Sequence, residues 1–274
     1  MEFTLDEQIV CQIARTFGPE DDFVISGTGP ATFVAAALAQ RLYAPRLAFY
    51  TTAFGRAAIL SEVSFPFKFG QPNPDWVMAT FDTEEIFSFV LGGKWCILMQ
   101  PVQVDQYGYM NLSQIGDKYR PSMVFVGSRG VPENTVNGRR IYYFVPNHSK
   151  RAFVEMVDFI SGVGYGPERR EGWIKWGVPY RVFSNLGIFD FDPDTGRMRL
   201  AGLYQGVSLN DVVANTGFEL VIPDPVPVAD PPTPQELKVL RQEIDPLATR
   251  RLDFAKGEAY KKILEEIRAR GGEM

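Results

Sequence analysis

Residues 23–52 have the sequence FVISGTGPATFVAAALAQRLYAPRLAFYTT, and this stretch predicts the fold. Phe23 to Ser26 is a short apolar strand, and Gly27-Thr28-Gly29 is a tight turn. An Ala-rich helix follows from Pro30 to about Tyr43, with proline at the first-turn position and an Ala-Pro pair beyond its end. Leu47 to Thr51 is apolar and aromatic enough to be a second buried strand. This order begins a parallel α/β sheet.

The turn Gly27-Thr28-Gly29 is a candidate ligand loop, because it precedes the N-terminus of a helix. It can contact a phosphate or the pantetheine arm of coenzyme A. It lacks the lysine of a P-loop and the third glycine of a dinucleotide fingerprint, so its spacing alone leaves the contact open.

A second informative stretch runs from Gln103 to Gly130. It combines a polar step at Ser113 to Asp117, an apolar segment at Met123 to Val126 and a glycine loop at Gly127 to Gly130. We expect a buried strand followed by a loop that presents backbone N–H groups to a ligand. The alternative is a plain turn that binds nothing.

Composition narrows the class of protein. The chain has 274 residues, 45% of them hydrophobic, and a formal net charge of -5, which argues against nucleic-acid and membrane partners. Cys11 and Cys96 are expected to be buried thiols in a reducing compartment. A single histidine, His148, leaves little material for a metal site or a Ser-His-Asp triad, so no metal is expected. Without a signal-peptide pattern, the cytoplasm is the expected location.

The remaining pattern predicts an open, largely parallel α/β sheet with flanking helices. Thr4 and Glu7 form a capping box for a first helix that ends at Gly18-Pro19. Further strands are predicted at Cys96–Gln100, Ile141–Val145, Phe153–Phe159, Tyr180–Phe191 and Met198–Leu203. We expect an α/β domain at residues 1–222, a Pro-rich tether at residues 223–234 and a C-terminal helical extension at residues 235–274.

Several short motifs in one order resemble the β subunit of the class I CoA-transferase family. They are Gly27-Thr28-Gly29, Gln103-Val104-Asp105-Gln106-Tyr107-Gly108, Ile115-Gly116-Asp117, Gly127-Ser128-Arg129-Gly130, Asn215-Thr216-Gly217-Phe218 and Glu243-Ile244-Asp245-Pro246. Other motifs, including Asn147-His148 and Ser161-Gly162-x-Gly164-Tyr165, resemble the β subunits of steroid-ring-opening CoA hydrolases. The resemblance implies a heteromeric assembly with an α subunit. It also implies an acyl-CoA thioester as substrate and no permanently bound cofactor.

The chain departs from the transferases at the family's nucleophile. The resemblance places a glutamate in the segment that corresponds to Tyr50-Thr51-Thr52-Ala53-Phe54-Gly55, and this segment contains no carboxylate. Thr52 cannot replace the glutamate, because an unactivated hydroxyl forms neither the anhydride nor the thioester that CoA exchange requires. The ring-opening hydrolases, by resemblance, use a glutamate of the α subunit instead.

Three functions therefore stand as hypotheses: a ring-opening acyl-CoA hydrolase, a CoA-transferase with its nucleophile elsewhere, and a non-catalytic structural subunit. In the first, Ser128 and the N–H groups of the glycine loop stabilise an oxyanion or enolate, at about 3 kcal/mol for each donor. Arg129 binds a substrate ketone or carboxylate, or forms a salt bridge with the partner. His148 is a proton relay or a structural histidine.

No residue of this chain is assigned a certain catalytic role. The candidate catalytic residues are Ser128, Arg129 and His148, and the candidate CoA-binding residues are Gly27, Thr28, Gly29, Thr52, Gly127 and Gly130.

Overall fold

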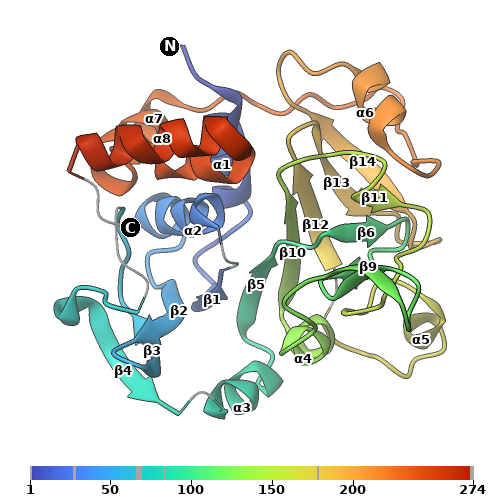
Figure 1. The fold of residues 1–274 in the computed structure, drawn as a ribbon, viewed down its shortest axis with the longest axis horizontal. Coiled ribbons are helices and arrows are strands. Elements are labelled where there is room, and N and C mark those ends of the chain that lie inside the picture. Colours follow the sequence, from blue (N-terminus) through green and yellow to red (C-terminus); the bar gives the residue numbers. More distant parts are fainter. Residues whose placement is uncertain (1, 27–28, 66–69, 83, 178, 272–274) are drawn as a thin grey trace. The chain divides into compact units, whose positions relative to one another are not determined.

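The computed structural model describes residues 2–271 except 27–28, 66–69, 83 and 178. Its contacts divide the chain into two compact units (Figure 1). The first unit comprises Met1–Phe89, Lys94–Leu98 and Pro231–Met274, and the second comprises Val90–Gly93 and Met99–Asp230. This division differs from the expected boundaries, because the C-terminal helices pack on the N-terminal ones and do not form a separate segment.

The sheet of the first unit contains β1 at its centre. β1 lies between β2 and β5, and both of these strands run parallel to it. Ile25 of β1 pairs with Tyr50 of β2 on one side and with Ile97 of β5 on the other. Two antiparallel strands, β3 and β4, continue the sheet beyond β2. The strands are β1 (Phe23–Ile25), β2 (Ala48–Ala53), β3 (Arg56–Leu60), β4 (Val77–Phe81) and β5 (Trp95–Met99). The predicted strand–helix–strand unit is confirmed, while Gly27 and Thr28 of its turn lie outside the described residues.

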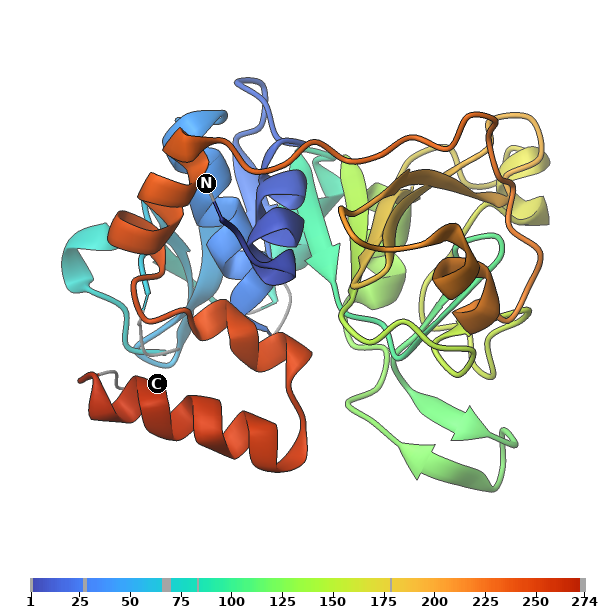
Figure 2. The same ribbon diagram turned by 90° about the horizontal axis from the view of Figure 1, so that it is seen from above.

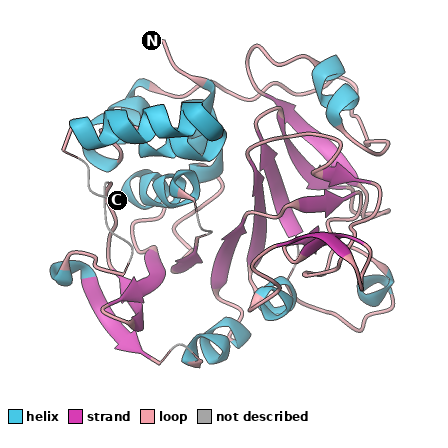
Figure 3. Cartoon of the chain, in the orientation of Figure 1, coloured by secondary structure: helices cyan, strands magenta, loops and turns pink. Residues whose placement is uncertain are grey.

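Helices of the first unit come from both ends of the chain and gather together (Figure 3). They include α1 (Leu5–Ala14), α2 (Pro30–Leu42), α7 (Pro234–Val239) and α8 (Gly257–Ala269), and α3 (Glu85–Leu91) follows β4. The predicted capping box of Thr4 and Glu7 is present, although α1 ends before Gly18-Pro19. The predicted helical extension at residues 235–274 is not one continuous helix, because a 3-10 turn at Thr249–Phe254 precedes α8.

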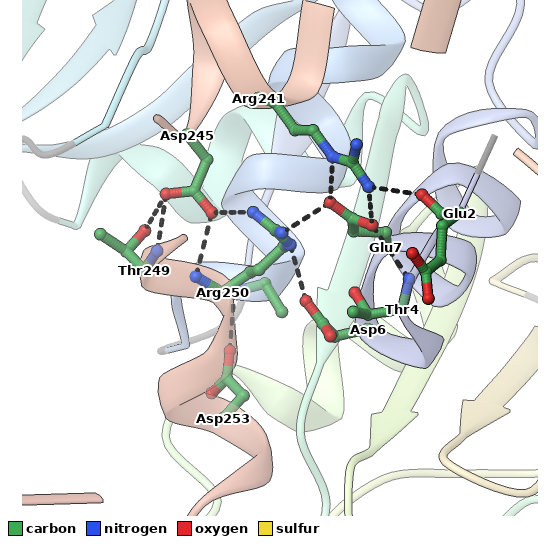
Figure 4. A network of polar contacts seen from close by, with 10 residues as sticks. Glu2, Thr4, Asp6, Glu7, Arg241, Asp245, Thr249, Arg250 and Asp253 are labelled. Atoms are coloured by element: carbon green, nitrogen blue, oxygen red, sulfur yellow. Dashed lines mark hydrogen bonds and ion pairs between the residues drawn. The ribbon is translucent and has the colours of Figure 1, made fainter. Parts of the chain in front are cut away.

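A buried ionic network attaches the C-terminal segment to α1 (Figure 4). The guanidinium of Arg250 donates to Asp6 at 2.7 Å, to Glu7 at 3.0 Å and to Asp245 at 3.0 Å. Arg241 donates to the same Glu7 carboxylate at 2.7 Å. Because Glu7, Asp245 and Arg250 are buried, each of these charges needs its partners to offset the cost of desolvation, while Arg241 contributes from the surface.

The second unit is built on the sheet of β10, β12, β13 and β14. β10 and β12 are parallel, and β13 and β14 continue the sheet with antiparallel pairs. A smaller sheet places β6 between parallel β11 and antiparallel β7. The elements are β6 (Gln103–Asp105), β7 (Met110–Asn111), α4 (Val131–Asn137), β10 (Arg140–Val145), β11 (Phe153–Val154), α5 (Pro167–Arg170), β12 (Pro179–Ser184), β13 (Gly187–Phe191), β14 (Met198–Leu203) and α6 (Leu209–Asn215).

Two predicted strands of this unit differ from the structure. The segment Phe153–Phe159 forms a strand only at Phe153–Val154, and the segment Tyr180–Phe191 is a hairpin of two strands. The chain turns at Asn185. The Ser184 hydroxyl stabilises this tight turn by accepting hydrogen bonds from the backbone N–H groups of Leu186 and Gly187. The residues at this turn, Ser184-Asn185-Leu186-Gly187, include no aromatic or β-branched residue, and Ser, Asn and Gly are typical of turns, so the sequence contains a turn signal that the prediction of one strand missed.

The prediction of a buried strand at Met123–Val126 is wrong. Pro121–Val124 forms β9, which pairs only with β8 (Gln114–Gly116) in a hairpin that extends from the second unit (Figure 2). The side chains of Met123, Val124 and Val126 are 55%, 70% and 60% exposed. A two-stranded ribbon has no second layer to cover its faces, so these apolar side chains lie on its surface.

The α/β class, with parallel strand pairs in the sheet of each unit and flanking helices, is confirmed, and antiparallel strands extend both sheets. The Pro-rich segment is extended, and residue Val228 forms a bridge to Leu203 at the end of β14. Among the described helices, none combines the length and the apolar character needed to cross a membrane.

Candidate functional site

The glycine loop, residues Gly127–Gly130, joins the β8–β9 hairpin to α4. Gly127 and Arg129 adopt left-handed backbone conformations, with φ of 82° and 45°. The Gly127 N–H donates to Leu112 O at 3.2 Å, so this amide is not available to a ligand. No described residue accepts a hydrogen bond from the N–H groups of Ser128, Arg129 or Gly130. Three of the four predicted amide donors are therefore open.

Ser128 belongs to a cluster of three serine hydroxyls. Its Oγ lies 3.1 Å from the Oγ of Ser113, which in turn lies 2.8 Å from the Oγ of Ser161. The backbone N–H of Leu112 donates to Ser161 Oγ at 2.9 Å. Neither Ser113 nor Ser161 was among the candidate site residues, because these serines are 48 residues apart in the chain and no local pattern joins them.

Arg129 is exposed, and its backbone is in the left-handed conformation, which residues other than glycine rarely adopt. No carboxylate in the described part of the chain forms an ion pair with its guanidinium. The side chain is therefore available to a partner outside this chain, whether substrate or protein.

His148 has a different environment. Its Nδ1 lies 2.9 Å from Ser184 Oγ and its Nε2 lies 3.0 Å from Thr216 Oγ1, so both ring nitrogens have hydrogen-bond partners. The ring is buried and stacks on Phe153. Burial lowers the pKa of His148 to about 3, which keeps the imidazole neutral near pH 7. This environment favours the structural role of the histidine over proton transfer.

Asp105 and Asn111 fix the turns that precede the serine cluster. The Asp105 carboxylate accepts hydrogen bonds from the backbone of Tyr107 at 2.9 Å and of Tyr109 at 3.1 Å. Burial raises the pKa of Asp105 to about 6, while these backbone donors oppose the shift. The Asn111 side chain accepts from the Ser113 N–H at 2.9 Å and so positions the first serine of the cluster.

Gly29 and Thr52, the described candidates of the first unit, lie near the carboxyl ends of β1 and β2, two parallel strands, where open α/β sheets bind ligands. Gly29 is the N-cap of α2, while Gly27 and Thr28 are outside the described residues. The next amide in the helix, the N–H of Ala31, donates to the Asp253 carboxylate at 2.7 Å. An anionic side chain therefore already occupies the first turn of α2, and it would repel a phosphate.

Thr52 is exposed near the end of β2, where it pairs with Ala57 of β3. The turn between these strands consists of Phe54 and Gly55, with φ of 53° and 82°, as in a two-residue hairpin turn. No described side chain forms a hydrogen bond with the Thr52 hydroxyl, so no base for it is present among the described residues. Glu62, the nearest carboxylate downstream, lies 3.9 Å from Arg41.

Within the described residues, no group of three or more His, Cys, Asp and Glu side chains is arranged to hold a metal ion. The arrangement instead provides hydrogen-bond donors and positive charge: open amides, a supported serine hydroxyl and an unpaired arginine. Such groups stabilise negative charge that develops on an oxygen atom.

Known proteins are similar to this chain in sequence and in fold. No family model matches it. The chain is 34% identical over 244 residues to the cholesterol ring-cleaving hydrolase IpdB subunit of Mycobacterium tuberculosis, covering 88% of this chain and 95% of the relative. The crystal structure of Rhodococcus jostii IpdAB superimposes with a TM-score of 0.82 at 29% identity, covering 93% of this chain and 100% of the matched one. One of the subunits of glutaconate CoA-transferase from Acidaminococcus fermentans is 36% identical over 154 residues, covering 53% of this chain and 54% of the relative.

The chain belongs to the class I CoA-transferase family, among its β subunits. Within this family, the similarity extends along nearly the whole IpdB subunit and along about half of the transferase subunit.

Proposed function

We propose that this chain is the β subunit of a heteromeric enzyme that acts on acyl-CoA thioesters and opens a carbon ring by hydrolysing a C–C bond. The observation that carries the proposal is the 34% identity to a ring-cleaving hydrolase subunit over 95% of that subunit's length. The catalytic glutamate is assigned to an α subunit, because residues 50–55 of this chain contain no carboxylate.

The proposed reaction is the hydrolysis of a cyclic β-keto acyl-CoA. The glutamate takes a proton from water, and the water oxygen bonds to the ketone carbon. The bond from this carbon to the α-carbon of the thioester then breaks, and its electron pair forms the thioester enolate. The glutamate returns the proton to the α-carbon, so the product carries a new carboxylate and is still a CoA ester.

The residues of this chain act on the negative charge of that enolate. Ser128 and the open N–H groups of Ser128, Arg129 and Gly130 donate hydrogen bonds to the thioester oxygen, and Gly127 sets the loop conformation. Arg129 holds the ketone or the new carboxylate, a role that its unpaired guanidinium supports. His148 supports the surrounding structure, since burial lowers its pKa to about 3.

The first unit contributes contacts to the CoA moiety. We assign the pantetheine arm, which is uncharged, to the loop Gly27-Thr28-Gly29 and to Thr52. The carboxylate of Asp253 at the first turn of α2 supports a neutral group at this position and opposes a phosphate.

An α subunit completes the site in this proposal. The matched crystal structure from Rhodococcus jostii is that of IpdAB, and the similar protein of Mycobacterium tuberculosis is named as one subunit of a hydrolase. The exposed apolar side chains of the β8–β9 hairpin agree with a surface that a partner covers.

The test combines this chain with an α-type subunit and supplies a polycyclic β-keto acyl-CoA in ¹⁸O-labelled water. We expect a ring-opened CoA ester that is heavier by one water, with the label in the new carboxylate, as measured by mass spectrometry. Transfer of CoA to an added carboxylic acid, without ring opening, would overturn the proposal.

A CoA-transferase is the second candidate, because the chain is 36% identical to a glutaconate CoA-transferase subunit over part of its length. A non-catalytic subunit is the remaining alternative. Under that alternative, substitution of Ser128 or Arg129 lowers assembly or stability and leaves the turnover of the assembled complex unchanged.

A further inference from the structure

The three serines Ser161, Ser113 and Ser128 form a line of hydroxyls that runs from the interior of the second unit toward the glycine loop. Ser161 is 2% exposed and Ser113 is 8% exposed, whereas Ser128 is only partly buried. The oxygen–oxygen distances along the line are 2.8 Å and 3.1 Å. Each hydroxyl has one hydrogen to donate and two lone pairs that can accept. Along the line, each serine that donates to the next one must therefore accept from the one before it.

The buried end of this line determines its direction. Ser161 Oγ accepts from the Leu112 N–H at 2.9 Å, and among the described residues the Ser113 oxygen alone is placed to accept the Ser161 hydrogen. A buried hydroxyl hydrogen without an acceptor is costly, so Ser161 donates to Ser113. Ser113 then donates to Ser128, its other neighbour. The Ser128 oxygen is an acceptor within the line, and its own hydrogen is left for an acceptor outside it.

The backbone around the line holds the three oxygens in place. Leu112 uses both of its backbone groups, because its N–H donates to Ser161 Oγ and its C=O accepts from the Gly127 N–H. The C=O of Ser113 accepts from the Phe125 N–H at 2.8 Å. The segment that carries Ser113 is thus connected both to Ser161 and to the loop that carries Ser128.

We propose that Ser161 and Ser113 are positioning residues that orient the Ser128 hydroxyl as a hydrogen-bond donor to the thioester oxygen of the acyl-CoA substrate. This inference rests on the proposed function, in which negative charge develops on that oxygen. As the charge grows, Ser128 donates more strongly, and each hydrogen bond along the line strengthens with it. Without Ser113, the Ser128 hydroxyl remains in the loop but loses the interaction that directs its hydrogen outward.

The first test measures turnover of the complex between this chain and an α-type subunit. We expect Ser128→Ala to lower kcat about 10²–10³-fold, as for loss of an oxyanion donor, and Ser113→Ala and Ser161→Ala to lower it about 10-fold. Ser122→Ala is the matched control, because this exposed serine of β9 donates to the Ile115 carbonyl at 3.1 Å and is outside the line. Its kcat should stay unchanged. Thermal unfolding of each variant separates turnover from folding.

The double variant distinguishes positioning from a general structural effect. If Ser113 acts through Ser128, adding Ser113→Ala to the Ser128→Ala variant does not lower kcat any further. The double variant then has the same kcat as Ser128→Ala alone. Losses that multiply, or a Ser113→Ala variant that behaves like the Ser122→Ala control, would overturn the inference.

A binding measurement separates this inference from the proposed function. The acyl-CoA thioester and the corresponding thioether, which lacks the carbonyl oxygen, are compared by calorimetry. We expect the unmodified complex to prefer the thioester, Ser113→Ala to lose part of that preference, and Ser128→Ala and the double variant to lose it to the same, larger extent. An unmodified complex that opens no ring contradicts the proposed function, but the thioester preference still decides the role of the serines. A complex with no preference for the thioester contradicts the inference.

Discussion

The imidazole of His148 stacks on the ring of Phe153, with centroids 3.6 Å apart and planes 3° from parallel. The hydroxyls of Ser184 and Thr216 hold the two ring nitrogens. A buried neutral imidazole with both nitrogens occupied is a structural element, and its protonation would place an unpaired charge among apolar groups.

The first prediction concerns how the free energy of unfolding depends on pH because His148 is buried in its neutral form. The pKa of His148 is about 3 in the folded chain and 6.5 in an ordinary environment, because burial disfavours the charged ring. The unfolded chain therefore binds a proton that the folded chain excludes between these values. The contribution of His148 to the free energy of unfolding is complete above pH 6.5 and falls by up to about 1.4 kcal/mol per pH unit below it.

Urea unfolding of the natural chain and of His148→Gln at pH 7.5 and pH 5 measures this contribution. We expect the variant to be less stable at pH 7.5, by about 1–3 kcal/mol, and the difference to shrink at pH 5. The contributions of other titrating groups, such as Asp105, to the pH dependence cancel when the free energies of unfolding of the two proteins are subtracted at each pH. A difference that stays constant with pH would contradict the burial argument.

The second prediction concerns Arg250, which forms ion pairs with Asp6, Glu7 and Asp245. Removal of this side chain in Arg250→Ala leaves buried carboxylates without their counterion and should lower the free energy of unfolding by about 3–5 kcal/mol. The neighbouring Arg251 pairs with Glu266 where both side chains are more than 40% exposed. Arg251→Ala should therefore cost less than about 1 kcal/mol. Equal losses of stability for the two variants would refute the distinction.

Local signals explain which parts of the fold the sequence predicts. The capping box predicted at Thr4 is confirmed, because both of its partners lie within one helical turn, and the structure shows a second box of the same kind at Ser208 and Asp211. Burial depends on distant residues, and so the apolar segment at Met123–Val126 was wrongly predicted as a core strand. The site shows the same limit: residue type identifies Ser128 as a donor, but only the folded chain brings Ser113 and Ser161 to it.

The third prediction concerns Arg169, whose guanidinium donates to four backbone carbonyls, those of Thr135, Gly164, Trp176 and Gly177. A lysine ammonium has three donors on one atom and cannot reach acceptors on four sides. We expect Arg169→Lys to lower the free energy of unfolding by about 1.5–3 kcal/mol in denaturant titrations. The exposed neighbour Arg170 provides the control. Arg170→Lys should change the free energy of unfolding by less than about 0.5 kcal/mol.

The fourth prediction concerns Asp253 and the type of group that α2 faces. Asp253→Asn removes a negative charge from the first turn of the helix and should lower the free energy of unfolding by about 0.5–2 kcal/mol. Because we assign the neutral pantetheine arm to this loop, the KM for acyl-CoA should not change. The control is Asp22→Asn, whose carboxylate forms an exposed pair with Arg46. A lower KM for Asp253→Asn alone would instead indicate a phosphate at the helix N-terminus.

The fifth prediction distinguishes the two enzymatic mechanisms by the covalent state of this chain. In a transferase, a carboxylate forms a thioester with CoA, and hydroxylamine or borohydride converts that thioester into a stable derivative. Residues 50–55 offer no carboxylate, and no described side chain forms a hydrogen bond with the exposed Thr52 hydroxyl. We therefore expect peptides from this chain, isolated after incubation of the complex with acyl-CoA, to carry no such derivative. Glu62 is the carboxylate to inspect first, because it is the nearest one downstream in the sequence, and its derivative would establish a transferase whose nucleophile lies in this chain.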